Sequence, residues 1–267
     1  MSLDLAATLR TATTIAREAG ALLLDGWRTG ASVQHKGEID LVTEFDLASE
    51  RLIRARMAAA FPDQGVVCEE AGGDSAKDLV WYCDPLDGTT NFAHGHFFYS
   101  VSLGLARRGT PVAGVVYAPA LDTAWTGGDG MGAWREQRGA RTEARVSTRA
   151  GTLSASLVGT GFPYDRRTSP ENNLREAARI IPRVQGIRRC GSAAMDLCLV
   201  ADGTYDAYWE QKLAPWDMCA GVAIARAAGA RVTDYEGAEP SLRVGRVVAS
   251  NGAVHDELMR EIAEARR

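Results

Sequence analysis

The order of helical and extended segments along this chain constrains its fold more than any other feature of the sequence. Apolar residues recur at steps of three and four over residues 4–27 and 46–61, which is the spacing of an amphipathic helix. Short β-like runs follow at 66–68, 79–83, 100–106 and 112–117, separated by glycine or proline. From residue 153 onward helical and extended patterns alternate to the end of the chain. We therefore expect layered α/β architecture, with helices covering the faces of sheets.

Expected elements continue through the second half of the chain without a break. We find no internal repeat or linker, so we expect a single domain with two lobes, residues 1–150 and 151–267, and no sharp boundary between them. Residues 32–36 alternate like an edge hairpin, and the glycine-rich segment 127–132 is typical of a hairpin turn. The elements expected in the second half are strands at 153–159, 186–189, 205–209, 230–233 and 247–250, and helices at 170–181 with Ser169 as cap, 192–201, 217–228 and 256–265.

The amino-acid composition limits the kinds of ligand and partner that we expect this chain to bind. Hydrophobic residues make up 46% and charged residues 24% of the 267 residues, and the net charge of -4 provides no general basic surface, so we expect no nucleic-acid partner. Five cysteines without a C-x-x-C pair indicate reduced core thiols rather than disulfides or a zinc site. No apolar stretch approaches membrane-spanning length, so we expect a cytoplasmic protein that does not bind membranes.

The apolar run 79–83 leads into Asp84-Pro85-Leu86-Asp87-Gly88-Thr89-Thr90-Asn91. Pro85 fixes its own φ, and Gly88 lets the backbone approach a ligand closely. Two nearby carboxylates suit Mg²⁺ or Mn²⁺, and the amides that follow Gly88 can hold a phosphate, especially if Thr89 begins a helical turn. An ordinary proline–glycine turn selects the same residues, so this motif alone leaves both interpretations open.

Three further acidic sites lie at the ends of expected elements. Glu69-Glu70 follows the run 66–68, Asp217 begins a helix, and Asp46 ends the segment Asp40-Leu41-Val42-Thr43-Glu44-Phe45-Asp46. Binding groups collect at element ends in α/β folds. Aspartate is also favoured as a helix cap, which is the alternative role for Asp217 and Asp46.

The motifs 84–92 and 216–221, together with the segments Gly191-Ser192-Ala193-Ala194 and Tyr208-Trp209-Glu210, occur in the order seen in one family. Over nearly its whole length the chain resembles the inositol monophosphatase family of metal-dependent sugar phosphatases. The resemblance implies an alternating αβαβα sandwich of the inositol monophosphatase and fructose-1,6-bisphosphatase-like fold.

By the same resemblance, Glu69, Asp84 and the carbonyl of Leu86 hold one Mg²⁺, and Asp84, Asp87 and Asp217 hold a second. Asp84 then bridges the two ions. A third, weaker ion near Glu69 is an additional expectation, and Mn²⁺ is expected to substitute for Mg²⁺.

The resemblance also assigns catalytic and phosphate-binding roles. Asp46 and Thr89 orient a water molecule and take its proton, with Glu69 as a further catalytic group, and the amides of Gly88 and Thr89 hold the phosphate. Glu70 is expected to support the site by hydrogen bonding, because adjacent strand residues face opposite sides. Lys36 lies in a hairpin that the family carries over the metals.

The resemblance also implies a set of residues that contact the substrate. Glu210 is the expected specificity residue among them, because a carboxylate accepts hydrogen bonds from vicinal hydroxyls. The expected substrate-binding residues are Asp87, Gly191, Ser192, Ala193 and Glu210.

Several residues near these motifs have simpler interpretations. We favour core packing for Cys83 over a redox role, and we favour a solvated strand edge for Arg188-Arg189 over an anion or partner site. Trp209 and Trp216 are expected in the core beside the site rather than as sugar-stacking platforms.

These observations predict Mg²⁺-dependent hydrolysis of a small polyol or sugar phosphate monoester by an activated water, with inositol 1-phosphate as the leading substrate and a homodimer as the assembly. Histidinol phosphate, fructose 1,6-bisphosphate and nucleotide 3'- or 2'-phosphates stay open because the metal ligands would be the same. A regulatory binding protein with this fold is the second class. A two-carboxylate glycosidase is the third, but it leaves the glycine and threonine amides without a role.

Overall fold

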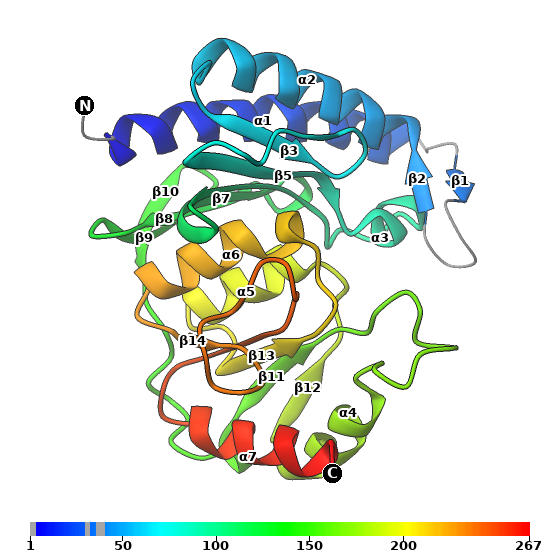
Figure 1. Ribbon diagram of the computed structural model, residues 1–267, viewed down its shortest axis with the longest axis vertical. Helices are drawn as coiled ribbons and strands as arrows, with labels where there is room; N and C mark the ends of the chain where they lie inside the picture. The colour runs from blue at the N-terminus through cyan, green and yellow to red at the C-terminus, as the bar shows by residue number, and fades with distance from the viewer. Residues whose placement is uncertain (1–3, 30–32, 36–40) are drawn as a thin grey trace.

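The computed structural model describes residues 4–29, 33–35 and 41–267. Helices and sheets alternate in five layers along the long axis of the molecule (Figure 1). The outer helices α1 and α2 cover one face of a large sheet, and α5 and α6 lie between that sheet and a smaller one. The helices α4 and α7 close the opposite end. This is the layer order expected from the sequence.

The large sheet has eight strands in the order β10-β9-β8-β7-β6-β5-β3-β4. It is an antiparallel meander from β5 to β10, and β3 pairs in parallel with the other side of β5. Because helices cover both faces, the central strands are buried and read as nearly continuous apolar runs. The strands are β3 (Gly65–Cys68), β4 (Gly72–Gly73), β5 (Leu79–Asp87), β6 (Ser100–Arg107), β7 (Thr110–Ala118), β8 (Thr123–Gly128), β9 (Gly132–Gln137) and β10 (Ala140–Ala144).

Local sequence sets the ends of α2, and glycines in the large sheet let α6 pack closely against it. Thr43 caps α2 by accepting from the backbone of Phe45 and Asp46, and Pro62 follows its end. On the other face, α6 lies against two strands at Gly104 and Gly114, where the missing side chains let the helix backbone approach. These helices are α1 (Leu5–Thr29), α2 (Glu44–Ala60), α5 (Ala193–Ala201) and α6 (Pro215–Ala227).

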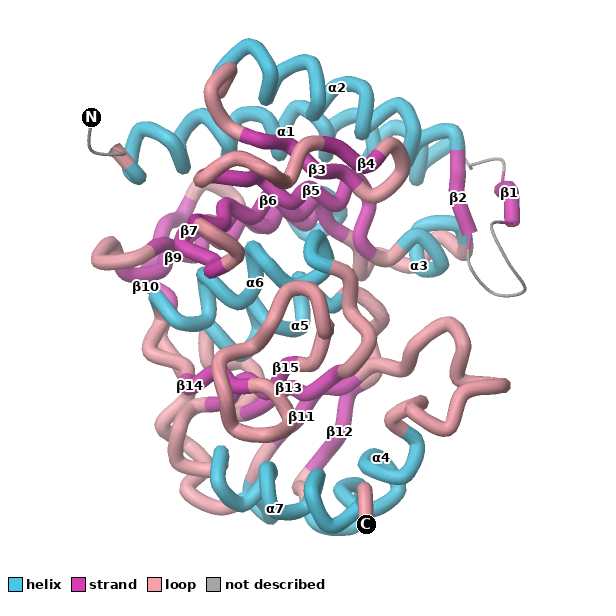
Figure 2. Tube along the Cα trace, viewed as in Figure 1, coloured by secondary structure: helices cyan, strands magenta, loops and turns pink. Residues whose placement is uncertain are grey.

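The smaller sheet has five strands in the order β12-β11-β13-β15-β14 (Figure 2). Its β11 pairs in parallel with β12 and β13, and the remaining pairs are antiparallel. Its elements are β11 (Leu157–Thr160), β12 (Gly186–Arg188), β13 (Ala207–Glu210), β14 (Arg231–Thr233) and β15 (Val247–Ser250), with α4 (Leu174–Ile180) and α7 (His255–Ala265) outside. The remaining elements are β1 (Val33–His35), β2 (Leu41–Thr43), α3 (Thr89–Ala93) and the 3₁₀ turns η1 (Pro119–Leu121), η2 (Leu153–Ala155) and η3 (Ile181–Arg183).

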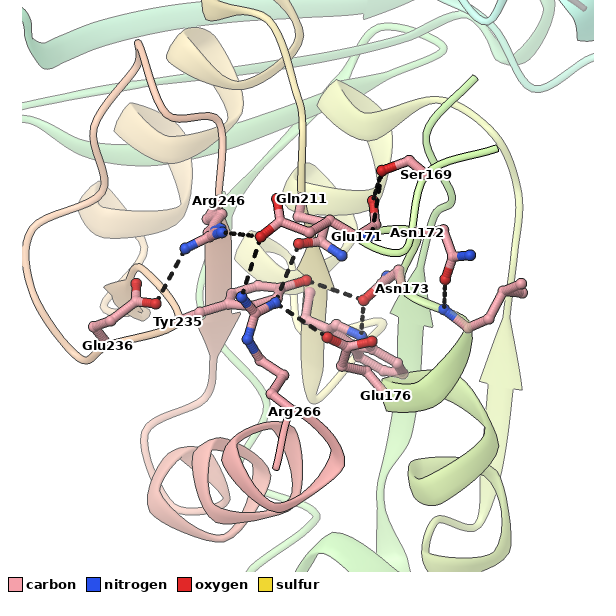
Figure 3. Close-up of polar contacts among 12 residues, drawn as sticks. Ser169, Glu171, Asn172, Asn173, Glu176, Gln211, Tyr235, Glu236, Arg246 and Arg266 are labelled. Carbon is pink, nitrogen blue, oxygen red and sulfur yellow. Dashed lines mark hydrogen bonds and ion pairs between the residues drawn. The ribbon is translucent and has the colours of Figure 1, made fainter. Parts of the chain in front are cut away.

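Two boundaries expected in the second half are wrong. The strand expected over 153–159 opens as the turn η2 and becomes extended at Leu157. The helix expected over 170–181 begins at Leu174, and Ser169 does not cap it. Asn173 precedes it with φ of 66°, and its side chain donates to Gly161 O at 2.7 Å. The side-chain oxygen of Asn173 accepts from Tyr235 Oη at 3.1 Å (Figure 3). These buried contacts outweigh the local preference for Ser169 as a helix cap.

All five cysteines are free thiols, as expected. Cys68 and Cys83 are paired on adjacent strands and are fully buried. The hydrogen bond with Cys68, followed by burial, raises the pKa of Cys83 well above its usual value, which agrees with core packing. In the described part of the chain, no helix is both long enough and apolar enough to cross a membrane.

Candidate functional site

A cleft of about 260 Å³ opens where the end of β5 faces the starts of α5 and α6. In Figure 1 these helix starts lie on the same side of the molecule as α3. A larger cavity of about 420 Å³ between α1 and β8–β9 has Glu136 as its one lining carboxylate and so offers no acidic pair. The smaller cleft brings together the expected site residues Glu69, Asp84, Leu86, Asp87, Gly88, Thr89, Gly191, Ser192, Ala193, Glu210 and Asp217.

The end of β5 is shaped by its own hydrogen bonds. The strand continues past the expected apolar run to Asp87, and its register against β6 shifts between Asp84 and Asp87. Asp84 Oδ1 accepts from the backbone of Leu86 at 2.9 Å. Gly88 then has φ of 96°, and a side chain there would lie 3.3 Å from the carbonyl oxygen of Gly191. The segment is both a tight turn and a wall of the cleft.

The carboxylate of Asp46 accepts hydrogen bonds from two residues, Thr43 and Thr89. Its Oδ2 accepts from the backbone of Thr43 at 2.8 Å and closes the cap of α2, whereas its Oδ1 accepts from Thr89 Oγ1 at 3.0 Å. Burial raises the pKa of Asp46, and hydrogen bonds from Thr43 and Thr89 oppose that effect. The capping role and the expected contact with Thr89 are therefore both present.

Thr89 is held at the start of α3 and is buried. Its Oγ1 lies 3.0 Å from Asp46 Oδ1 and 3.0 Å from the carbonyl oxygen of Leu86. A hydroxyl has one proton, and both of these neighbours are acceptors. The remaining lone pairs of Thr89 can therefore accept a hydrogen bond from a molecule in the cleft.

The carboxylates of the cleft raise one another's pKa. Burial, followed by the charges of Glu69, Asp87 and Asp217, raises the pKa of Asp84 well above its usual value. Burial and the charges of Asp87 and Glu69 do the same for Asp217. Like charges held together away from water are relieved by protons or by cations.

The donor set fits a hard divalent cation, because carboxylate and carbonyl oxygens are the ligands that Mg²⁺ and Mn²⁺ prefer. Over residues 4–29, 33–35 and 41–267, no three acidic, histidine or cysteine side chains are grouped as a formed metal centre. Donors from the protein hold some of these acids: Ala214 N donates to Asp217 Oδ2 at 2.7 Å, and Leu86 N donates to Asp84. Hydrogen bonds of this kind fix the orientation of carboxylates that bind a metal ion.

Asp87 connects the end of β5 to the start of α5. Ser192 Oγ donates to Asp87 Oδ2 at 2.5 Å, and the backbone of Ala194 donates to the same oxygen at 2.9 Å. Ser192 also caps α5 by accepting from Met195 N at 3.4 Å. Burial raises the pKa of Asp87 to about 6, with the bonds from Ser192 and Ala194 opposing. Residues more than a hundred positions apart thus form one wall.

Glu210 is the last residue of β13 in the smaller sheet and lines the cleft. It is buried, it accepts a hydrogen bond from Tyr208 Oη, and its carboxylate packs against the bare Cα of Gly161. Burial raises the pKa of Glu210 to about 7, and the hydrogen bond from Tyr208 opposes the increase. A substituted residue at 161 would collide with this carboxylate.

The turn after β3 carries Glu69 and Glu70, and a residue absent from the expected site holds it. Glu50, buried on α2, accepts from the backbone of Glu70 at 2.8 Å and of Ala71 at 2.9 Å. Glu50 lies four residues after Asp46, on the same helix face, which is the signal that could have identified it. Lys36 lies outside the described residues.

One expectation about neighbouring residues holds and one is wrong. Arg188 on the edge strand β12 and Arg189 directly after it are both exposed, as expected, and Arg189 also lines the cleft. Trp209 is fully buried as expected, but Trp216 is half-buried and lines the cleft beside Asp217. The start of α6 and the end of β12 bring Trp216 and Arg189 to the cleft, which adjacent sequence positions do not reveal.

Residues 4–267 match the family model described as the inositol monophosphatase family. A Synechocystis protein named inositol-1-monophosphatase is 40% identical over 263 residues, which is 97% of this chain and 90% of the relative. A Neisseria meningitidis protein named putative Nus factor SuhB is 35% identical over 259 residues, which is 96% of this chain and 97% of the relative. The solved structure of inositol monophosphatase from Anabaena (Nostoc) aligns at a TM-score of 0.88 and 38% identity, covering 98% of this chain and 97% of that chain. The expected fold is confirmed.

Proposed function

Because this chain belongs to the inositol monophosphatase family and is a phosphoric monoester hydrolase, we propose that it hydrolyses a small polyol phosphate, with inositol 1-phosphate as the leading substrate, using Mg²⁺. One observation carries the proposal. Five carboxylates, the Asp46–Thr89 hydrogen bond and the backbone of Gly88 and Thr89 belong to one cleft or its wall. A metal-dependent phosphatase uses each of these parts.

The proposed metal ligands are the acids of this cleft. Glu69, Asp84 and the carbonyl of Leu86 would hold one Mg²⁺, and Asp84, Asp87 and Asp217 would hold a second. Bound cations would neutralise charge on the phosphate and the leaving oxygen and lower the pKa of a water molecule. The raised pKa values of Asp84 and Asp217 support this assignment, because burial and the charges of neighbouring acids raise them and bound cations would relieve both effects. A third, weaker ion near Glu69 and substitution by Mn²⁺ belong to the same proposal.

The chain's own groups would orient the nucleophile. Thr89 Oγ1, with its proton directed to Asp46 or Leu86 O, accepts a hydrogen bond from water and aligns it towards phosphorus. Asp46 then receives the proton through Thr89, and Glu69 is a further catalytic group in the same cleft. The amides of Gly88 and Thr89 donate to the phosphate oxygens.

The alcohol would lie between the start of α5 and the end of β13. Asp87, Gly191, Ser192 and Ala193 line one side, and Glu210 lines the other. Glu210 accepts hydrogen bonds from hydroxyls of the alcohol, and Glu70 supports the turn that carries Glu69. Lys36 is proposed to approach the metals from its hairpin. The first lobe, residues 1–150, would thus supply the phosphate groups and all the proposed metal ligands except Asp217, and residues 151–267 would add Asp217 and complete the substrate site.

Release of inorganic phosphate from inositol 1-phosphate tests the proposal. We expect hydrolysis with Mg²⁺ or Mn²⁺, none in EDTA, and loss of activity in Asp87→Asn. Histidinol phosphate, fructose 1,6-bisphosphate and nucleotide 2'- and 3'-phosphates complete the panel. Glu210→Gln should change the preference among alcohols more than the metal requirement. Hydrolysis of no ester in the panel would refute the function.

A regulatory binding role is the second candidate, because a relative at 35% identity is named a putative Nus factor. Partners that an affinity pull-down recovers equally with wild type and Asp87→Asn would favour it. We also propose a cytoplasmic homodimer without a nucleic-acid or membrane partner, on the family resemblance and the acidic net charge of -4. Light scattering after size exclusion measures the dimer directly.

A further inference from the structure

The cleft is lined by a positively charged side chain, Arg189, that has no role in the proposed chemistry. Arg189 and Lys212 are its basic lining residues. Lys212 Nζ is committed to Asp165 at 2.6 Å and to Ser169 at 2.7 Å. Within the described part of the chain Arg189 forms no ion pair, and its side chain is exposed to solvent in the cleft. Its guanidinium is therefore available to a ligand.

The position of Arg189 is set by the backbone beneath it. A Cβ on Gly191 would lie 2.5 Å from Arg189 Nη1, so the guanidinium lies across the bare Cα of Gly191. Gly191 has φ of 85° and belongs to the proposed substrate wall. The charge of Arg189 also acts on buried Glu210 and Asp196, lowering the pKa of both against the effect of burial. The guanidinium thus faces the alcohol side of the cleft.

Arg189 and Glu210 offer complementary chemistry on that side. Glu210 accepts hydrogen bonds from hydroxyls, whereas a guanidinium presents five donors in a fork that matches a phosphate or carboxylate. The four metal-ligand acids would be neutralised by bound cations, so an anion near Arg189 would not face their uncompensated charge. A neutral polyol has no group that needs this donor.

We propose that Arg189 forms a second anion subsite, which selects phosphate monoesters whose alcohol carries another phosphate or a carboxylate. The subsite deepens the proposed phosphatase function and rests on it. A sugar bisphosphate would place its scissile phosphate at Gly88 and Thr89 and its second phosphate at Arg189. Glu210 would then contact the hydroxyls between them.

Fructose 1,6-bisphosphate and fructose 1-phosphate form a matched pair, because they differ in the second phosphate alone. We expect wild-type kcat/KM to be higher for the bisphosphate. Arg189→Gln should lower kcat/KM for the bisphosphate by about tenfold more than for fructose 1-phosphate, since charge-assisted hydrogen bonds are the strong ones. Arg189→Lys should recover part of the preference. Arg188→Gln, a neighbouring arginine outside the cleft, is the control and should leave the preference as in wild type.

Equal losses for the two esters in Arg189→Gln would overturn the inference, because they would place Arg189 at the scissile phosphate or in a structural role. Calorimetry measures the binding of fructose 6-phosphate in the presence of Mg²⁺ and orthophosphate. It tests the anion subsite at Arg189 even if no ester is cleaved. Arg189→Gln should weaken this binding by about tenfold relative to Arg188→Gln. Failure of hydrolysis alone refutes the proposed function, whereas unchanged fructose 6-phosphate affinity refutes the subsite.

Discussion

Thr89 Oγ1 lies 3.0 Å from Asp46 Oδ1, although the two residues are 43 positions apart in the chain. The bond joins the start of α3 to the first turn of α2, and both side chains are buried. Since Asp46 also closes the cap of α2, the stability of that helix start and the orientation of Thr89 depend on one carboxylate.

Removing the Thr89 hydroxyl should therefore impair catalysis more than folding. Thr89→Val keeps the shape of the side chain but deletes the contact with Asp46, and we expect kcat to fall by about 10²- to 10⁴-fold, the contribution typical of general acid–base groups. Thr89→Ser should retain much of the activity. Exposed Thr90 provides the matched control, Thr90→Val. Equal kcat in the two valine variants would contradict the role of Thr89.

Neutralising Asp84 should have opposite effects with and without metal. In EDTA, we expect Asp84→Asn to unfold at a higher temperature than wild type. The substitution removes a carboxylate that is disfavoured by burial and by the charges of Glu69, Asp87 and Asp217, while the amide oxygen still accepts from Leu86 N. With Mg²⁺, wild type should gain thermal stability and the variant should not.

Differential scanning fluorimetry in EDTA and in millimolar Mg²⁺ measures both effects. Asp129→Asn, at an exposed position away from the cleft, is the control and should respond to Mg²⁺ as wild type does. An Asp84→Asn protein that gains as much stability from Mg²⁺ as wild type would exclude Asp84 as a ligand.

Gly114 should be intolerant of even one methyl group. A Cβ there would lie 2.5 Å from the carbonyl oxygen of Ala220 on α6, and neither backbone can move without disturbing the sheet. We expect Gly114→Ala to lower the free energy of unfolding by about 1–3 kcal/mol or more, the usual cost of overpacking. Because α6 carries Asp217, activity should fall as well.

Urea unfolding followed by circular dichroism gives this free energy. Gly151 is the control, since a Cβ there meets no heavy atom within 4 Å. Gly151→Ala should change stability by about 0.5 kcal/mol or less. Similar stability of the two alanine variants would mean that α6 does not pack as closely on β7 as described.

His255 should make the folded state less stable in acid. It is buried at the start of α7, where Ser250 and Thr233 contact its ring nitrogens at 2.8 and 3.0 Å. Burial, followed by the charge of Arg231, lowers its pKa to about 4. Between that value and the ordinary pKa, the unfolded chain binds a proton that the folded chain does not, so stability falls as pH falls.

The contribution of His255 between pH 7 and pH 5 should be about 2 kcal/mol. Acids with raised pKa, such as Glu210 and Asp87, act with the opposite sign over this range, so the difference between wild type and His255→Gln isolates the histidine. Urea midpoints at the two pH values measure it. The same pH dependence in both proteins would contradict the prediction.

Local patterns identified most elements because helical and extended periodicities are properties of neighbouring residues. The helix start at Leu174 was missed because buried Asn173 makes its decisive contacts with residues distant in sequence, Tyr235 among them. Local capping preference favoured Ser169, whose hydroxyl instead accepts from Lys212. A local rule fails where a buried polar side chain needs distant partners.

By itself, the sequence determined the types of the elements and the acidic residues that the cleft would contain, because residue chemistry and the order of motifs are local. The tertiary structure decided how they meet. It placed Ser192 on Asp87, directed Thr89 to Asp46, and turned Arg189 into the cleft while leaving Arg188 outside. These outcomes depend on strand register and on helices packing against sheets, which bring together atoms that no sequence spacing relates.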